Sequence, residues 1–237
     1  MRNMLEVKEL NVMRGRLQVI WDVSINVKDG EIVALIGSNG AGKTTLLSTI
    51  AGLLKPYSGT ILFRNIKISG LPPYTIVNLG ISFVPEDRKL FANCSVRENL
   101  LLGAYSSRAK GHKKDMLETI YQIFPRLKER EKQLASTLSG GEQRMLTIAR
   151  SLMSNPELLL VDEPSQGLSP KMASEVFRTL EKLKERGISI LLAEQNIYYA
   201  LKIADRAYVM EVGKVTLEGK SSDLLANSHV KEAFLGL

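Results

Sequence analysis

A nine-residue loop near the N-terminus restricts the possible folds of this chain more than any other stretch. Residues 37–45 fit the pattern G-x-x-x-x-G-K-[ST], with an apolar run before them and leucine and isoleucine at helical spacing after them. Between a strand and a helix this pattern is a P-loop, whose glycines let backbone N–H groups turn inward around a polyphosphate. Lys43 can reach the β- and γ-phosphates, and Thr44 can offer its hydroxyl to Mg²⁺. The predicted nucleotide-binding residues of the loop are Gly37, Ser38, Asn39, Gly40, Ala41, Gly42, Lys43, Thr44 and Thr45.

Composition and hydropathy are those of a soluble globular protein. The 237 residues are 44% hydrophobic and 24% charged, which is ordinary for a chain with a sizeable core. The longest apolar runs, such as residues 188–193, are far shorter than the roughly 18–20 residues that cross a bilayer. Cys94 is the only cysteine, which excludes an internal disulfide and a cysteine-built metal site. We expect a protein of the reducing cytoplasm that neither spans a membrane nor is exported.

The net charge of +7 leaves several partners open. It is compatible with nucleic acid, with an anionic membrane face or with a phosphate ligand. Residues 108–132 contain eight Lys or Arg against four Asp or Glu, so this stretch supplies four of the seven net charges. We interpret it as a solvated helix face. Aromatic residues are few and do not alternate with the basic ones, which argues against a platform for single-stranded nucleic acid.

Two kinds of apolar spacing divide the chain. Alternation of apolar and polar residues predicts strands over residues 4–9 and 19–27, and it places Trp21 on the buried side of the second strand. Residues 87–154 instead carry apolar side chains mainly at helical spacing, which predicts a helical insertion. The chain therefore begins as a β-rich unit, and a helical segment interrupts its core.

A pair of carboxylates follows the next apolar run. Residues 158–161 are uninterrupted apolar residues, typical of a parallel strand that is covered on both faces, and they lead into Asp162 and Glu163. The carboxyl end of such a strand is where an open α/β sheet places its ligands. This is a Walker B pattern, in which Asp162 holds Mg²⁺ and Glu163 polarises the attacking water as a general base.

A second anion site is indicated by Leu138-Ser139-Gly140-Gly141-Glu142-Gln143, which opens a helix. Ser139 can donate its hydroxyl, the two glycines leave N–H groups uncovered, and the helix dipole adds partial positive charge. Between a P-loop and a Walker B pattern, this string resembles the signature motif of ABC-transporter ATPases. In that family two ATP-binding domains enclose two ATP molecules, so the resemblance implies that Ser139, Gly140, Gly141 and Glu142 serve the nucleotide of a partner chain.

The resemblance covers the whole chain and implies its fold. We expect a single α/β domain over residues 1–237, a P-loop NTPase of the ABC ATPase type. Residues 1–86 and 155–237 would form the ATP-binding core, a mixed sheet with an antiparallel β subdomain. Residues 87–154 would form the helical subdomain that carries the signature motif.

Finer motifs narrow the function. The strings Val84 to Arg88, Asp162 to Pro170 and Ala193 to Asn196 resemble those of one ATPase subunit of branched-chain, hydrophobic amino-acid importers, the LivF type. This implies ATP hydrolysis that powers import, on the inner face of the membrane. The implied partners are a sister ATPase subunit, permease subunits docked on the helical subdomain and, indirectly, a periplasmic or extracellular binding protein. An export ATPase, for example for lipopolysaccharide, is the nearest alternative, and a soluble ABC ATPase acting on nucleic acid or ribosomes is a more distant one.

Three positions depart from the usual family pattern. Glu86 replaces a glutamine, but it can still approach Mg²⁺ while adding a negative charge. Gln195 replaces a histidine that contacts the γ-phosphate; its amide can donate a hydrogen bond without carrying charge, or it is merely a polar residue at a helix start. Arg14 replaces an aromatic residue that stacks on adenine. Its guanidinium can stack on a purine, or it is exposed without a role.

Overall fold

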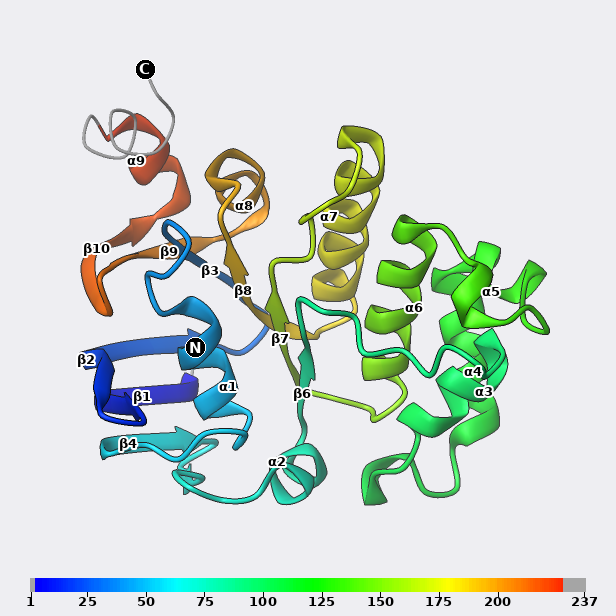
Figure 1. The fold of residues 1–237 in the computed structure, drawn as a ribbon, viewed down its shortest axis with the longest axis horizontal. Helices are drawn as coiled ribbons and strands as arrows, with labels where there is room; N and C mark the ends of the chain where they lie inside the picture. The colour runs from blue at the N-terminus through cyan, green and yellow to red at the C-terminus, as the bar shows by residue number, and fades with distance from the viewer. Residues whose placement is uncertain (1–2, 228–237) are drawn as a thin grey trace.

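The computed structural model describes residues 3–227, which form two sheets and a group of helices at one end (Figure 1). The smaller sheet is antiparallel, with strand order β2-β1-β4-β5. Its predicted β-rich character is confirmed. The strands are β1 (Asn3–Arg14), β2 (Leu17–Lys28), β4 (Ser58–Phe63) and β5 (Ile66–Lys67).

The larger sheet has six strands in the order β10-β9-β3-β8-β7-β6. Every neighbouring pair is parallel except β9 with β10, which form an antiparallel hairpin. The sheet is therefore mixed, as predicted. Its strands are β3 (Ile32–Ile36), β6 (Ile81–Val84), β7 (Leu158–Asp162), β8 (Ser189–Glu194), β9 (Arg206–Glu211) and β10 (Lys214–Lys220).

Helix α1 (Lys43–Ile50) packs against strands of both sheets. The core accordingly has two parts, one between the sheets and one on the opposite face of the larger sheet. Strand β3 contributes to both, because Ile32, Ala34 and Ile36 face one part while Val33 and Leu35 face the other. A strand buried on both faces holds its carboxyl end firmly, and the P-loop begins at that end.

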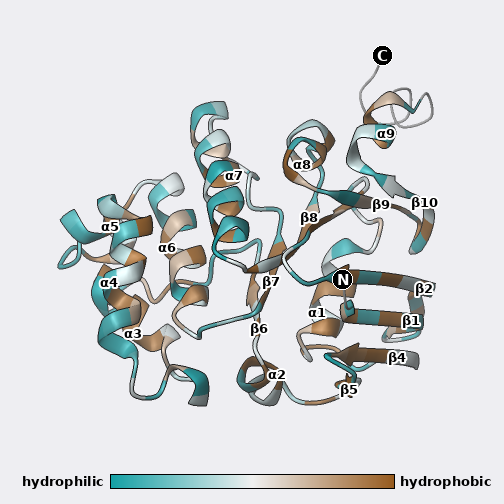
Figure 2. Cartoon of the chain, turned by 180° about the vertical axis from the view of Figure 1, so that it is seen from behind, coloured by the Kyte–Doolittle hydropathy of each residue, from teal (hydrophilic) through white to brown (hydrophobic). Residues whose placement is uncertain are grey.

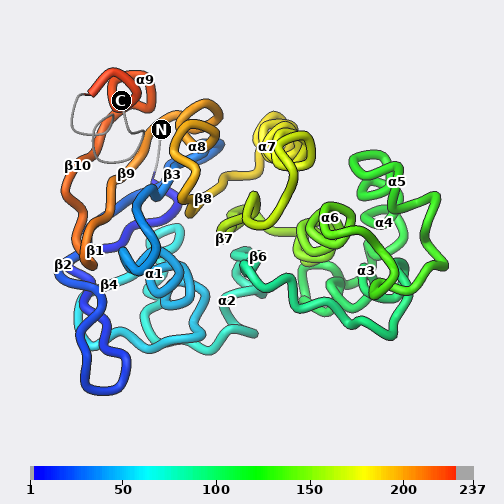
Figure 3. Tube along the Cα trace, turned by 45° about the horizontal axis from the view of Figure 1, so that its top comes forward, coloured from blue at the N-terminus to red at the C-terminus, as the bar shows by residue number. Residues whose placement is uncertain are grey.

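The helical insertion lies at the end of the molecule opposite the β1–β2 hairpin (Figure 3). Its helices turn hydrophobic faces inward and polar faces outward (Figure 2). They are α3 (Val96–Gly103), α4 (Lys113–Ile123), α5 (Pro125–Glu129) and α6 (Gly140–Leu152), with the 3₁₀ turns η1 (Ser107–Ala109) and η2 (Ala135–Thr137). The remaining helices are α2 (Pro73–Leu79), α7 (Pro170–Glu185), α8 (Ile197–Ile203) and α9 (Ser221–Ala226). Over residues 3–227 no helix has the length and apolar character needed to cross a membrane.

The prediction that Trp21 is buried was wrong, since its side chain is 44% exposed. Asp22 adopts φ +48°, and the pairing of β1 with β2 shifts register beside it. A β-bulge of this kind adds one residue and reverses which side chains of a strand face the core. Ile20 is consequently buried, whereas Trp21 lies on the outer face with the ammonium of Lys214 6.0 Å from its ring centroid.

Candidate nucleotide site

The P-loop connects the carboxyl end of β3 to the N-terminus of α1, as the sequence predicts. Its glycines are required by space as well as by backbone angle. A Cβ on Gly37 would lie 2.3 Å from the carbonyl oxygen of Met210, and Gly42 adopts φ +104° with a would-be Cβ 2.8 Å from Ile20 Cδ1. Strands β2 and β9 therefore hold the loop close, and its N–H groups line the opening above α1.

Lys43 is almost completely buried, with 3% of its surface exposed. Its ammonium donates hydrogen bonds to the carbonyl oxygens of Gly37 at 2.7 Å and Ser38 at 3.1 Å, and it pairs with Glu163 Oε1 at 3.0 Å. The phosphate-binding cation and the predicted general base are thus in direct contact. A γ-phosphate that engages Lys43 competes with the carboxylate of Glu163.

The predicted metal ligands are also close together. Thr44 Oγ1 donates to Asp162 Oδ1 at 3.2 Å. The pKa of Asp162 is raised to about 6, chiefly by burial; the Thr44 bond and the charge of Lys43 lower it, and the charges of Glu163 and Glu86 add to the rise. A hydroxyl beside crowded carboxylates is a set of hard oxygen donors, which fits Mg²⁺. A cation there would relieve the repulsion among the three carboxylates.

A cavity of about 370 Å³ collects most of the predicted site residues. The exposed Arg14 lies at its rim and Glu86 on its wall, so both unusual residues face the same opening as the P-loop. Sequence reasoning assigned no role in the site to Val19 or to Gln166, although Gln166 lies within the string Asp162 to Pro170. The lining consists of Arg14, Val19, Asn39, Gly40, Ala41, Gly42, Lys43, Thr44, Thr45, Glu86, Glu163 and Gln166.

Gln195 contacts the site through its backbone. Its side chain is exposed, whereas its N–H donates to Glu163 Oε2 at 3.2 Å. The following Asn196 caps α8, its side chain accepting from the N–H of Tyr199 at 3.4 Å. The stretch begins a helix, as the second reading of Gln195 expects, and its backbone also binds the predicted general base. A contact between the Gln195 side chain and a phosphate stays a prediction.

The signature residues form a compact helix start away from this cavity. Ser139 caps α6, and Glu142 completes a capping box by accepting from the N–H and hydroxyl of Ser139 at 2.9 and 2.7 Å. The Glu142 carboxylate also pairs with Arg130 at 3.0 Å. None of the residues 139–142 lines the cavity of the chain's own P-loop. This separation agrees with a motif that serves another chain's nucleotide.

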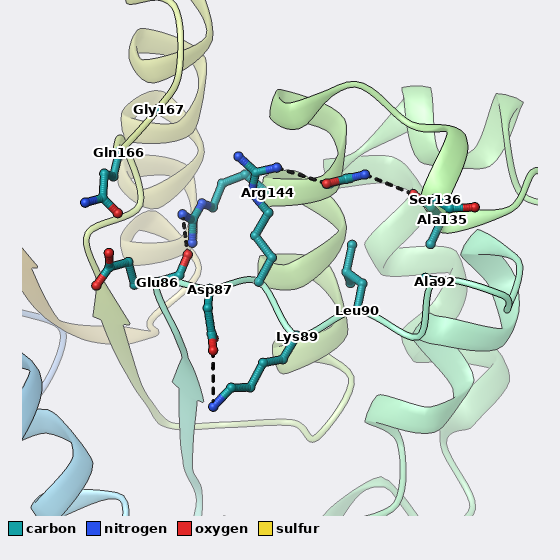
Figure 4. Close-up of a pocket in the computed structure, with 12 residues that line it drawn as sticks. Glu86, Asp87, Lys89, Leu90, Ala92, Ala135, Ser136, Arg144, Gln166 and Gly167 are labelled. Carbon is teal, nitrogen blue, oxygen red and sulfur yellow. Dashed lines mark hydrogen bonds and ion pairs between the residues drawn. The ribbon is translucent and has the colours of Figure 1, made fainter.

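Arg144 is a further residue that sequence reasoning missed. It is 1% exposed, and its guanidinium donates to the carbonyl oxygens of Pro85 at 2.9 Å and Glu86 at 2.8 Å. Figure 4 shows it reaching from α6 to the loop that carries Glu86. The predicted metal ligand is thereby tied to the helix that begins with the signature motif.

Comparisons with known proteins agree with these features. The sequence model of the ABC transporter family matches residues 20–166. BraG of Pseudomonas aeruginosa, a high-affinity branched-chain amino acid transport ATP-binding protein, is 45% identical over 98% of this chain and 100% of its own. LivF of Archaeoglobus fulgidus, a probable branched-chain amino acid transport ATP-binding protein, is 38% identical over 99% of each chain. LptB of Escherichia coli K12, a lipopolysaccharide export system ATP-binding protein, is 33% identical over 94% of this chain and 92% of its own.

Solved structures show the same fold. An ATP-binding cassette of an ABC transporter in its ADP conformation matches with a TM-score of 0.85 at 29% identity, over 100% of both chains. A dimeric bacterial ABC transporter cassette matches with a TM-score of 0.80 at 28% identity, over 92% of this chain and 99% of that one. The predicted P-loop fold and the resemblance are both confirmed. The chain belongs to the ABC transporter family of ATP-binding proteins and is an ATPase of that family.

Proposed function

We propose that this chain hydrolyses ATP to power an importer of branched-chain, hydrophobic amino acids. The observation that carries the proposal is the 45% identity to BraG over 98% of this chain and 100% of BraG. The 33% identity to LptB makes lipopolysaccharide export the second candidate. Both candidates use the same nucleotide chemistry, and they differ in the permease that the subunit drives.

The site residues suggest how the reaction proceeds. The P-loop would hold the phosphates, Lys43 would leave Glu163 for the γ-phosphate, and Glu163 would then orient the attacking water. Thr44, Asp162 and Glu86 would hold Mg²⁺, whose charge stabilises the phosphate oxygens when it is bound. Ser139 to Glu142 of a sister subunit would close the site, since this chain's own signature residues lie away from its P-loop cavity.

Residues 86–92 are the proposed contact for a permease subunit. All of them except Phe91 line one wall of a cavity of about 630 Å³, and parts of α6, η2 and the loop after β7 line the rest (Figure 4). Arg144 links α6 to Glu86 in this wall, so a permease segment seated there would sense the predicted metal ligand. The subunit would then work on the inner face of the membrane, with a periplasmic or extracellular protein that delivers the amino acid. No nucleic-acid partner is required.

An uptake assay tests the assignment. In a host strain without the gene, the wild-type chain should restore uptake of radiolabelled leucine, whereas Glu163→Gln should not. Glu181→Gln is a matched control, because this carboxylate is exposed on α7. Normal leucine uptake in the deletion strain, together with loss of lipopolysaccharide from the cell surface, would instead select the export function.

A further inference from the structure

Glu194, the last residue of β8, is a buried carboxylate that the chemistry above does not use. It is 1% exposed, and within residues 3–227 no lysine or arginine forms an ion pair with it. Oε1 accepts from the N–H of Ser165 at 3.0 Å, and Oε2 accepts from the N–H of Asn196 at 3.1 Å. Burial raises the pKa of Glu194, while the bonds from Ser165 and Asn196 act in the opposite direction. Both oxygens therefore serve to hold backbone.

Glu194 connects two loops, and each of them contains a residue that is predicted to take part in ATP hydrolysis. The loop of residues 163–168 begins with the general base Glu163, and the loop of residues 194–196 contains Gln195. Glu163 makes the reciprocal contact, because its Oε2 accepts from the N–H of Gln195 at 3.2 Å. A backbone bond from Glu163 N to Ala193 O at 2.9 Å adds a further link between the two segments. Each loop thus contributes one carboxylate that binds an N–H of the other, and we refer to Glu163 and Glu194 as the crossed carboxylates.

The crossed carboxylates fix the direction of the general base. Glu163 has φ +44°, so its backbone is held in a conformation that side chains rarely adopt. One of its oxygens faces Lys43, and the other accepts from the backbone N–H of Gln195. This backbone N–H stays in place because Glu194 binds the next backbone N–H along the chain, that of Asn196. Loss of the second link removes one restraint on the backbone N–H of Gln195, and with it one restraint on Glu163.

We propose that Glu194 is a positioning residue for ATP hydrolysis, which holds residues 163–168 and 194–196 in the register that aims Glu163 at the attacking water. It acts through the backbone amides of Ser165 and Asn196 and does not touch the nucleotide. The P-loop lies outside this network apart from Lys43. Loss of Glu194 leaves the ion pair between Lys43 and Glu163 in place, so it should lower turnover while changing nucleotide affinity little.

Glu194→Gln tests the proposal, since glutamine keeps the size of the side chain but offers one oxygen where two are needed. Hydrolysis by the ATPase dimer that contains the variant chain should show kcat lowered at least tenfold, with KM for ATP and the midpoint of thermal unfolding close to wild type. A residue that only supports the fold would lower stability and ATP affinity together with kcat. Glu181→Gln, an exposed carboxylate of α7, is the control and should leave all three unchanged.

A kcat within twofold of wild type would overturn the proposal, and so would a fall in kcat matched by equal losses of ATP affinity and stability. If Glu194→Gln does not fold, Glu194→Asp replaces it, because aspartate keeps both acceptors but is one methylene shorter. It should lower kcat at unchanged KM, and a wild-type kcat would reject the positioning role. The assay requires no transported amino acid, so its failure leaves the import function untouched.

Discussion

In the Glu163→Gln variant, a neutral contact of the same size replaces the buried ion pair between the predicted general base and the P-loop lysine. The 3.0 Å between Lys43 Nζ and Glu163 Oε1 corresponds to an attraction of about 5–6 kcal/mol at an effective dielectric constant of about 20. Desolvation of the two charges offsets most of this attraction. Lys43 also keeps its bonds to the carbonyl oxygens of Gly37 and Ser38. We take the net loss as about 1–2 kcal/mol, roughly a factor of 5–30 in an equilibrium constant.

Binding and turnover should therefore change in opposite directions. The variant should bind ATP about 5–30-fold more tightly, because Lys43 no longer has to leave a carboxylate to reach the γ-phosphate. Its turnover should fall by roughly 10²–10⁴, the usual contribution of a general base. Titration calorimetry with ATP in the absence of Mg²⁺ measures the first effect, and steady-state phosphate release measures the second. Glu181→Gln should change neither.

Two results would refute this reasoning separately. Hydrolysis at the wild-type rate would show that Glu163 is not the base. Unchanged or weaker ATP binding would show that the contact between Lys43 and Glu163 does not compete with the nucleotide.

Three further variants test other parts of the structure. Gln195→His keeps the backbone N–H that binds Glu163 and adds an imidazole, so kcat for ATP hydrolysis should rise. An unchanged kcat would argue against the idea that the glutamine side chain lowers the rate. Gly103→Ala would place a Cβ 2.1 Å from the carbonyl oxygen of Arg150, so the crossing of α3 and α6 should lose about 1–3 kcal/mol, measurable by calorimetry. Burial alone would raise the pKa of Glu142, but the bonds from Ser139 and the charge of Arg130 outweigh it and hold the pKa below its usual value. The ionised Glu142 carboxylate therefore stabilises the folded chain at pH above the unfolded-state pKa of about 4.3. This contribution is lost as pH falls through the lower pKa of the folded state, so Glu142→Gln should weaken the acid-induced drop in melting temperature.

The fold was largely predictable because its strands bury whole runs of apolar residues. The uninterrupted run before Asp162 and the alternation in β1 and β2 each leave a direct trace in the sequence. Trp21 shows where this approach fails, because alternation predicts a face only while the strand is regular. The bulge at Asp22 shifts the pattern by one residue, and no glycine marks it; a single aspartate inside a strand pattern is too common to indicate a bulge.

The site was predictable where its chemistry is local and not where it depends on the main chain. The P-loop and the Asp162–Glu163 pair are contiguous, so their spacing alone indicates their function. Arg144 and Glu194 are isolated residues that bind backbone atoms. Arg144 donates to the carbonyl oxygens of residues 85 and 86, and Glu194 accepts from the N–H groups of residues 165 and 196. Any residue supplies such a carbonyl, and any residue except proline supplies the N–H, so no side-chain pattern at the partner positions reveals the contact. It follows that residues 165 and 196 should tolerate most substitutions without loss of these backbone bonds, whereas proline at either position removes the donor that Glu194 binds.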